Sequence, residues 1–185
     1  MIVRPRLPAD LPGLADVLAA QQPASGYPQR WPLPFPVEDF LVREGELGAW
    51  VAEVEDAAIG TQRLAGHVSV TGAGDGVEAD GWSLGTGRPL AELAAVSVLF
   101  VDHTLAGRGI GTALLDAAVA FIRASGRAPV LDVVQESADA VAFYRARGWQ
   151  VIGEARPWWL PDDLLPVLLM TLPDTSPAGR GVTAR

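Results

Sequence analysis

The sequence predicts an α+β fold in which one mixed, mostly antiparallel sheet of six to seven strands is flanked by about four helices. Two observations favour this class. Segments with strand-like patterns come first, at 2–4, 50–54 and 64–70. From residue 91 onward the pattern alternates strand, helix, strand, helix and strand. A run of strands followed by alternating elements is typical of α+β proteins with a mixed sheet.

Length and composition favour a single domain with a sizeable core. The chain has 185 residues, of which 49% are hydrophobic. We assign 1–173 to the domain and expect 174–185 to be a flexible tail, because it is rich in Pro, Gly, Thr and Arg. The net charge of −8 makes nucleic acid a poor partner. Acidity favours solubility, or contact with a cationic small molecule or basic peptide.

The chain contains no cysteine and two histidines. Disulfides, a thiolate nucleophile and a cysteine-ligated metal are therefore excluded, and we expect no metal site. The N-terminus lacks the apolar core of a signal peptide, and the longest apolar run, 93–101, has the length of a strand. We therefore expect a cytoplasmic protein without a membrane partner.

After the first strand, helical signals begin. Asp10 is suited to cap a helix with Pro12 in its first turn, and apolar residues recur at helical spacing to about Ala20. Residues 21–36 contain many prolines but also Tyr, Trp and Phe. We expect an ordered loop there, because disordered linkers contain few aromatic residues. A short helix is expected over 38–43.

The strands at 50–54 and 64–70 are expected to pair as an antiparallel hairpin with its turn over 56–62. The next segment, 71–89, is rich in glycine. We interpret it as a loop, which is either a mobile insertion or a cover over a site. A buried strand over 93–101 follows.

The remaining elements surround a glycine-rich turn at 104–111. A long helix follows this turn and ends near Gly126. The last expected elements are a strand, a helix and two strands, over 129–134, 137–147, 149–154 and 165–172. Because the first N–H groups of a helix lack intrahelical partners and the helix dipole attracts negative charge, the turn is suited to hold phosphate.

The glycines of the turn alone leave several interpretations open. No Gly-Lys-Ser/Thr follows at the spacing of a P-loop. A dinucleotide-binding turn belongs near the start of a parallel unit, whereas at least three strand candidates precede this one. A plain strand-to-helix turn, with glycines only for packing, is the remaining alternative.

The segment 101–115, VDHTLAGRGIGTALL, resembles the acyl-CoA-binding signature of the GNAT superfamily of N-acetyltransferases. The signature, Gln/Arg-x-x-Gly-x-Gly/Ala, corresponds to residues 106–111. Ala106 stands where the family has Gln or Arg. One side chain is therefore missing from the implied pyrophosphate loop, and the backbone donors and Arg108 remain.

A second segment, 137–149, SADAVAFYRARGW, is similar to the family motif Asn-x-x-Ala-x-x-Phe-Tyr-x-x-x-Gly-Phe. Ser137 replaces the Asn, and either residue can cap a helix. Trp149 replaces the final Phe. The two motifs, together with the order of elements over 2–172, imply an acetyl-CoA-dependent N-acetyltransferase acting on a primary amine of a small molecule or peptide.

The resemblance also implies which residues hold acetyl-CoA. Its pantetheine arm would follow the main chain at the end of the strand, where one N–H would stabilise the oxyanion. The implied cofactor-binding residues are Leu99, Phe100, Val101, Ala106, Gly107, Arg108, Gly109, Ile110, Gly111, Thr112, Ser137, Phe143 and Tyr144. Tyr144 is further implied as the general acid, since a phenol is protonated at neutral pH. A tyrosine with its ring in the core is the alternative.

For the general base, the resemblance implies Glu92, which opens the strand leading to the turn. A solvated carboxylate at a strand end is the alternative. His103 titrates in a suitable range. It lies with Asp102 in the loop after the strand, where we expect a structural role or a place at the cofactor's edge.

For the acceptor pocket we expect Trp31, Glu38 and Trp82, because aromatic rings and carboxylates suit a cationic amine. Capping of the core or a homodimer contact is the alternative. Two rival functions stay open: a non-catalytic acyl-CoA sensor, and a nucleotide-binding domain that uses the glycine turn.

Overall fold

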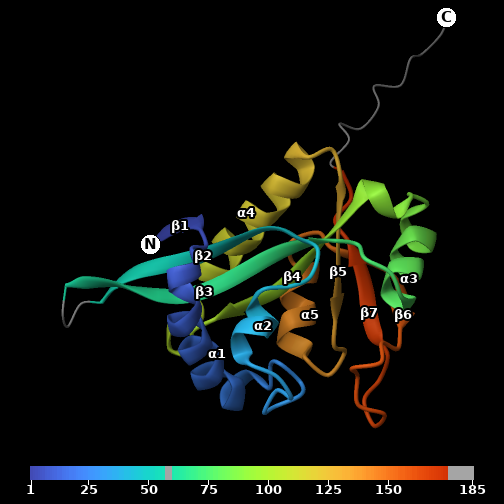
Figure 1. Cartoon of the computed structure of the whole chain (residues 1–185). Helices are drawn as coiled ribbons and strands as arrows, with labels where there is room; N and C mark the ends of the chain where they lie inside the picture. The colour runs from blue at the N-terminus through green and yellow to red at the C-terminus, as the bar shows by residue number, and fades with distance from the viewer. Residues whose placement is uncertain (57–59, 175–185) are drawn as a thin grey trace, which may run out of the picture.

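One seven-stranded sheet runs through the computed structural model, which describes residues 1–56 and 60–174 (Figure 1). The strand order is β1-β2-β3-β4-β5-β7-β6. The strands are β1 (Ile2–Pro5), β2 (Glu46–Asp56), β3 (Thr61–Gly72), β4 (Leu93–Val101), β5 (Ala128–Val133), β6 (Gln150–Ala155) and β7 (Val167–Thr171). Neighbouring strands are antiparallel, except for the parallel pair β4 and β5. The expected α+β class with a mixed, mostly antiparallel sheet is therefore confirmed.

Helices cover both faces of this sheet. Within the described residues they are α1 (Leu11–Ser25), α2 (Val37–Leu41), α3 (Val77–Thr86), α4 (Ile110–Ala124) and α5 (Ala138–Arg145). On one face, α4 and α5 share a large apolar cluster with the strands. On the opposite face, α1 and α2 cover one half and α3 covers the other. No helix in the described ranges is long and apolar enough to cross a membrane.

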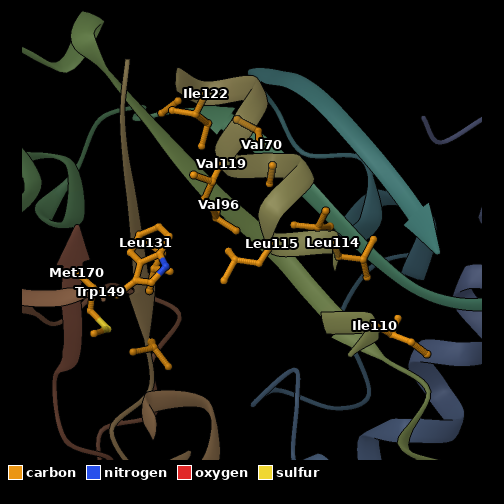
Figure 2. Packing of buried hydrophobic residues seen from close by; sticks show 14 of the residues in the cluster. Val70, Val96, Ile110, Leu114, Leu115, Val119, Ile122, Leu131, Trp149 and Met170 are labelled. Atoms are coloured by element: carbon orange, nitrogen blue, oxygen red, sulfur yellow. The ribbon is translucent and has the colours of Figure 1, made fainter. Parts of the chain in front are cut away.

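The apolar stripe of α4 explains the largest cluster. Ile110, Leu114, Leu115, Val119 and Ile122 recur at helical spacing and are all at most 7% exposed. Figure 2 shows several of these side chains beside Val70 and Val96 of the sheet. A helix packed in this way presents its N-terminal turn from a fixed position.

The segment 71–89, expected to be a loop, contains α3. Its glycines reflect close packing, because a Cβ at Gly81 would lie 2.2 Å from Leu169 Cδ1 and one at Gly85 would lie 2.8 Å from Ile152 Cβ. Only glycine lets the helix backbone approach β6 and β7 this closely. The interpretation of this segment as a loop was therefore wrong.

Other boundaries also differ from the prediction. Helix α1 continues past Ala20, with Pro23 inside it, and ends at Gly26 in the left-handed conformation. Strands β2 and β3 are longer than the expected hairpin segments. Residues 57–59 of its expected turn and residues 175–185 of the expected tail lie outside the described part of the chain.

The sheet opens between β4 and β5. These strands pair only from Leu93 and Ala128 to Ala95 and Val130. Beyond this point β4 continues along β3, and β5 continues along β7. The two central strands therefore diverge (Figure 1), and backbone groups on their facing edges are free of strand pairing.

Candidate functional site

The turn between β4 and α4 leaves the start of a 15-residue helix open. Gly107 (φ 78°) and Gly109 (φ 79°) have left-handed backbones, and a Cβ at either would meet no atom within 4 Å. Ala113 donates to the carbonyl of Gly109 at 3.0 Å, so the N–H groups of 110–112 precede the first intrahelical bond. Together with the exposed Arg108, these donors suit an anion.

The two sequence motifs meet at this turn. Phe143 of α5 lies against Gly111, where a Cβ would be 3.6 Å from the ring. Arg147, just after α5, donates to the hydroxyl of Thr112 and to the carbonyl of Phe143 (2.8 Å). Its guanidinium lies 3.7 Å from the centre of the Phe143 ring. These contacts attach the end of α5 to the start of α4, although the motifs are far apart in the sequence.

A β-bulge interrupts β4 at the opening. The register with β3 shifts between His67 opposite Phe100 and Ser69 opposite Ser97, which leaves one extra residue on β4. Val98 has a φ of 49°, which is strained for a β-branched residue. His67 is completely buried, and its Nδ1 lies 3.0 Å from the carbonyl oxygen of Val98.

Beyond the bulge, the side chains of β4 belong to the core. Phe100 is buried against α1, and Leu99 and Val101 pack on the cluster of α4. A ligand in the opening would therefore meet these residues through their main chain. Ser137 occupies the N-cap position of α5 as expected, but its side chain makes no capping hydrogen bond.

Tyr144 of α5 follows Phe143, the residue that lies against the turn at Gly111. Its ring packs edge-on against Phe143 and Trp149, with centroid distances of 5.2 and 5.8 Å. Burial raises the pKa of its phenol, and the charge of Asp132 raises it further. Tyr144 is therefore protonated at neutral pH, as a proton donor must be.

Asp132 is a site residue that the sequence analysis missed. It lies on β5, two residues beyond the last pair with β4, and is half-buried. Burial raises the pKa of its carboxyl to about 6, and the charge of Glu78 also raises it. The available signal was a single charged residue within the apolar strand PVLDVV.

The structure does not bring Glu92 to the opening. Glu92 precedes β4 at its paired end, six residues from Val98, which corresponds to about 20 Å along a strand. Its exposed carboxylate lies 3.9 Å from Arg88. This position matches the solvated alternative, and the role of Glu92 as general base stays a prediction.

The two rivals for the base also lie outside the opening. Asp102 forms an ion pair with Arg63 at 2.6 Å and accepts from the backbone N–H of Thr104 at 2.9 Å, so it fixes the start of the turn. Desolvation acts to raise the pKa of Asp102, but these bonds outweigh it and hold that pKa low. His103 is exposed on the turn.

The expected acceptor residues are dispersed. Trp82 of α3 is 5% exposed and donates to the carbonyl of Leu131 at 3.1 Å, so it belongs to the core, in agreement with the alternative considered for it. Trp31 is half-buried against the cluster of α1. Glu38 of α2 is exposed. Tyr27, from the same region of the chain, interacts electrostatically with Asp132 and Tyr144.

Comparison with known proteins agrees with this geometry. The acetyltransferase (GNAT) family model matches residues 14–149, which include the turn, the opening and α5. The chain belongs to the GNAT family. An uncharacterised N-acetyltransferase of Methanocaldococcus jannaschii is 37% identical over 68 residues, which are 36% of this chain and 30% of that relative. The matched segment of this chain therefore spans less than a third of the relative's length.

Solved structures share the GNAT fold. A GCN5-related N-acetyltransferase from Kribbella flavida superposes with a TM-score of 0.63 at 22% identity, over 92% of this chain and 95% of that one. Arabidopsis thaliana NAA60, in complex with a bisubstrate analogue, superposes with a TM-score of 0.65 at 20% identity, over 92% of this chain and 95% of that one. The ribosomal-protein-S18-alanine N-acetyltransferase of Escherichia coli superposes with a TM-score of 0.61 at 18% identity, over 99% of both chains. At these identities the likeness concerns the fold.

Proposed function

We propose that this protein transfers the acetyl group of acetyl-CoA to a primary amine of a small molecule or peptide. The observation that carries the proposal is the meeting of the open turn before α4 with the helix of Tyr144, beside the opening between β4 and β5. Such a site combines anion donors, free strand edges and a protonated phenol. Acyl transfer from a phosphate-bearing thioester can use all three.

The turn fits the phosphates of the cofactor. Two glycines in left-handed conformation leave the loop without Cβ atoms near the backbone donors, and Arg108 supplies a cation. Ala106 is exposed and contributes no donor from its side chain. Affinity would therefore depend on the backbone N–H groups and Arg108. Among solved relatives with this fold, Arabidopsis thaliana NAA60 is known in complex with acetyl-CoA.

The residues around the opening would supply the chemistry. Acetyl-CoA brings the thioester, and a backbone N–H of 99–101 would donate to its carbonyl oxygen as negative charge develops there. Tyr144 would give its proton to the departing thiolate. No covalent link between acetyl group and protein is needed in this direct transfer.

The test combines turnover and binding. Acetyl-CoA is mixed with the protein and a panel of diamines, aromatic monoamines and short peptides with a free N-terminus, and released thiol is measured. We expect release that depends on both the protein and one class of amine. Binding of acetyl-CoA without release across the panel would favour the acyl-CoA sensor. Thermal stabilisation by NAD or ATP but not by acetyl-CoA would favour the nucleotide-binding alternative.

A further inference from the structure

Asp132 is placed at the opening by the geometry of β5. Strand residues alternate between faces, and Leu131 and Val133 belong to the cluster of α4, whereas Val130 and Val134 belong to the cluster of α3. Asp132 therefore lies on the face that carries α1, α2 and α3. This position is opposite to α4, whose turn would hold the cofactor phosphates, so it faces the side from which an acceptor can enter.

Titratable groups from several surrounding segments interact electrostatically with this carboxyl. Tyr27 lies after α1, Arg43 after α2, Glu78 on α3 and Tyr144 on α5, and each interacts electrostatically with Asp132. The charge of Glu78 affects Asp132 more strongly than that of Arg43. Arg43 also lies over the ring of Phe40, 5.4 Å from its centre. The surroundings are therefore aromatic and, on balance, favour a cation.

Asp132 also differs from other partly buried carboxylates in lacking an ion pair. Asp10 pairs with Arg4 at 2.7 Å, and Glu46 pairs with Arg6 at 2.7 Å. Over residues 1–56 and 60–174, the carboxylate of Asp132 has no salt bridge and no hydrogen bond from another side chain, and its hydrogen bond comes from its own backbone N–H. An unpaired carboxylate in such surroundings decreases stability, and sites of this kind are enriched at functional positions.

We propose that Asp132 accepts the proton of the acceptor ammonium, and that the acceptor is therefore a cationic primary amine that approaches from the face of the sheet carrying α1, α2 and α3. This inference rests on the acetyltransferase function proposed above. The amine nitrogen, once neutral, forms a bond to the thioester carbonyl carbon, and the carbon–sulfur bond breaks. The thiolate takes the proton of Tyr144, which regains one from the nitrogen as the amide forms. Asp132 releases its proton to water.

The test is the Asp132→Asn variant, with Asp116→Asn as the matched control. Asp116 is exposed on α4, so the same chemical change there should leave activity unaltered. For an aliphatic amine at pH 7 we expect Asp132→Asn to lower kcat/KM about a hundredfold or more. The KM for acetyl-CoA and the thermal shift that acetyl-CoA causes should not change.

Two readouts separate proton transfer from a structural role. In the wild type, kcat/KM should fall at acidic pH with an apparent pKa near that of Asp132, about 6, and this limb should vanish in Asp132→Asn. With an aromatic amine of low basicity, which is already neutral at pH 7, the Asp132→Asn variant should lose much less activity than with an aliphatic amine. The variant should fold at least as stably as wild type at pH 8, because it removes a half-buried charge.

The outcomes are distinguishable. If the wild type releases no thiol with any amine, the acetyltransferase function fails, and this inference fails with it. If the wild type is active and Asp132→Asn stays within twofold of it, or keeps the acidic limb, only the role of Asp132 is overturned. Loss of acetyl-CoA binding in the variant would likewise overturn it.

Discussion

The Nδ1 atom of His67 lies 3.0 Å from the carbonyl oxygen of Val98, at the bulge of β4. Arg6 Nη1 lies 3.1 Å from the other ring nitrogen, Nε2. Because an arginine can only donate, Nε2 must accept, and Nδ1 therefore carries the hydrogen and donates to Val98. Arg6 in turn pairs with Glu46 and donates to the carbonyl of Leu41, both at 2.7 Å. The strained backbone of Val98 is thus held by a partly buried chain of polar groups.

Replacing His67 tests whether this contact positions the strand for catalysis. We expect His67→Phe to lower kcat about a hundredfold, because a shift of the proposed oxyanion donor at 99–101 by about 1 Å has an effect of this size. The KM for acetyl-CoA should change little. His67→Asn, whose amide can still donate to Val98, should restore much of the rate. A His67→Phe enzyme with wild-type kcat would contradict the prediction.

The pH dependence of stability should contain two opposing contributions. Burial lowers the pKa of His67 to about 4, below its usual 6.5, so the unfolded chain binds its proton first as pH falls. The stability present above pH 6.5 is therefore lost between 6.5 and 4, by roughly 3 kcal/mol. The raised pKa of Asp132 acts in the opposite sense, and stability falls as pH rises from 3.8 to 6.

Single variants should reveal each contribution. Urea unfolding between pH 4 and 7 should show that His67→Asn loses less stability than wild type on acidification. The Asp132→Asn variant should lose more stability than wild type on acidification. Parallel profiles for wild type and both variants would show that neither group titrates differently in the folded and unfolded states.

The conformation of Gly109 provides a test of the turn. Gly109→Ala should decrease stability by about 1–2 kcal/mol, because an alanine at a φ of 79° is strained. We also expect a raised KM for acetyl-CoA, since the backbone donors move. Gly126→Ala, at a φ of 75° beyond the other end of α4, is the control. Gly126→Ala should decrease stability by a similar amount without changing the KM for acetyl-CoA. An equal rise of this KM in both variants would refute the role of the turn.

Removal of the phenol hydroxyl tests the proposed acid. Tyr144→Phe keeps the ring that packs on Phe143 and Trp149, so the fold should be preserved. We expect kcat at pH 7 to fall about a hundredfold, the usual size of a lost proton donor. Acetyl-CoA should still stabilise the variant in thermal melts. An unchanged rate would assign Tyr144 to packing alone.

Much of this protein follows from local sequence patterns. Glycines at 107 and 109 before an apolar periodic helix predicted the turn, because a left-handed backbone and a helix start are local properties. The same patterns predicted the seven strands and four of the five α-helices of the described residues in their order. The glycines of α3 were misinterpreted because their reason, contact with β6 and β7, is not local.

Tertiary structure alone decided which groups share the opening. Asp132 lies beside the opening because β4 and β5 diverge after three paired residues on each strand, whereas Glu92 lies at the paired end. His67 reaches Val98 only through the register of β3 with β4. Sequence spacing cannot supply such contacts, because strand register and helix packing between distant segments determine them. The sequence therefore determined most of the elements and the glycine turn, whereas the pairing of strands determined which side chains lie beside that turn.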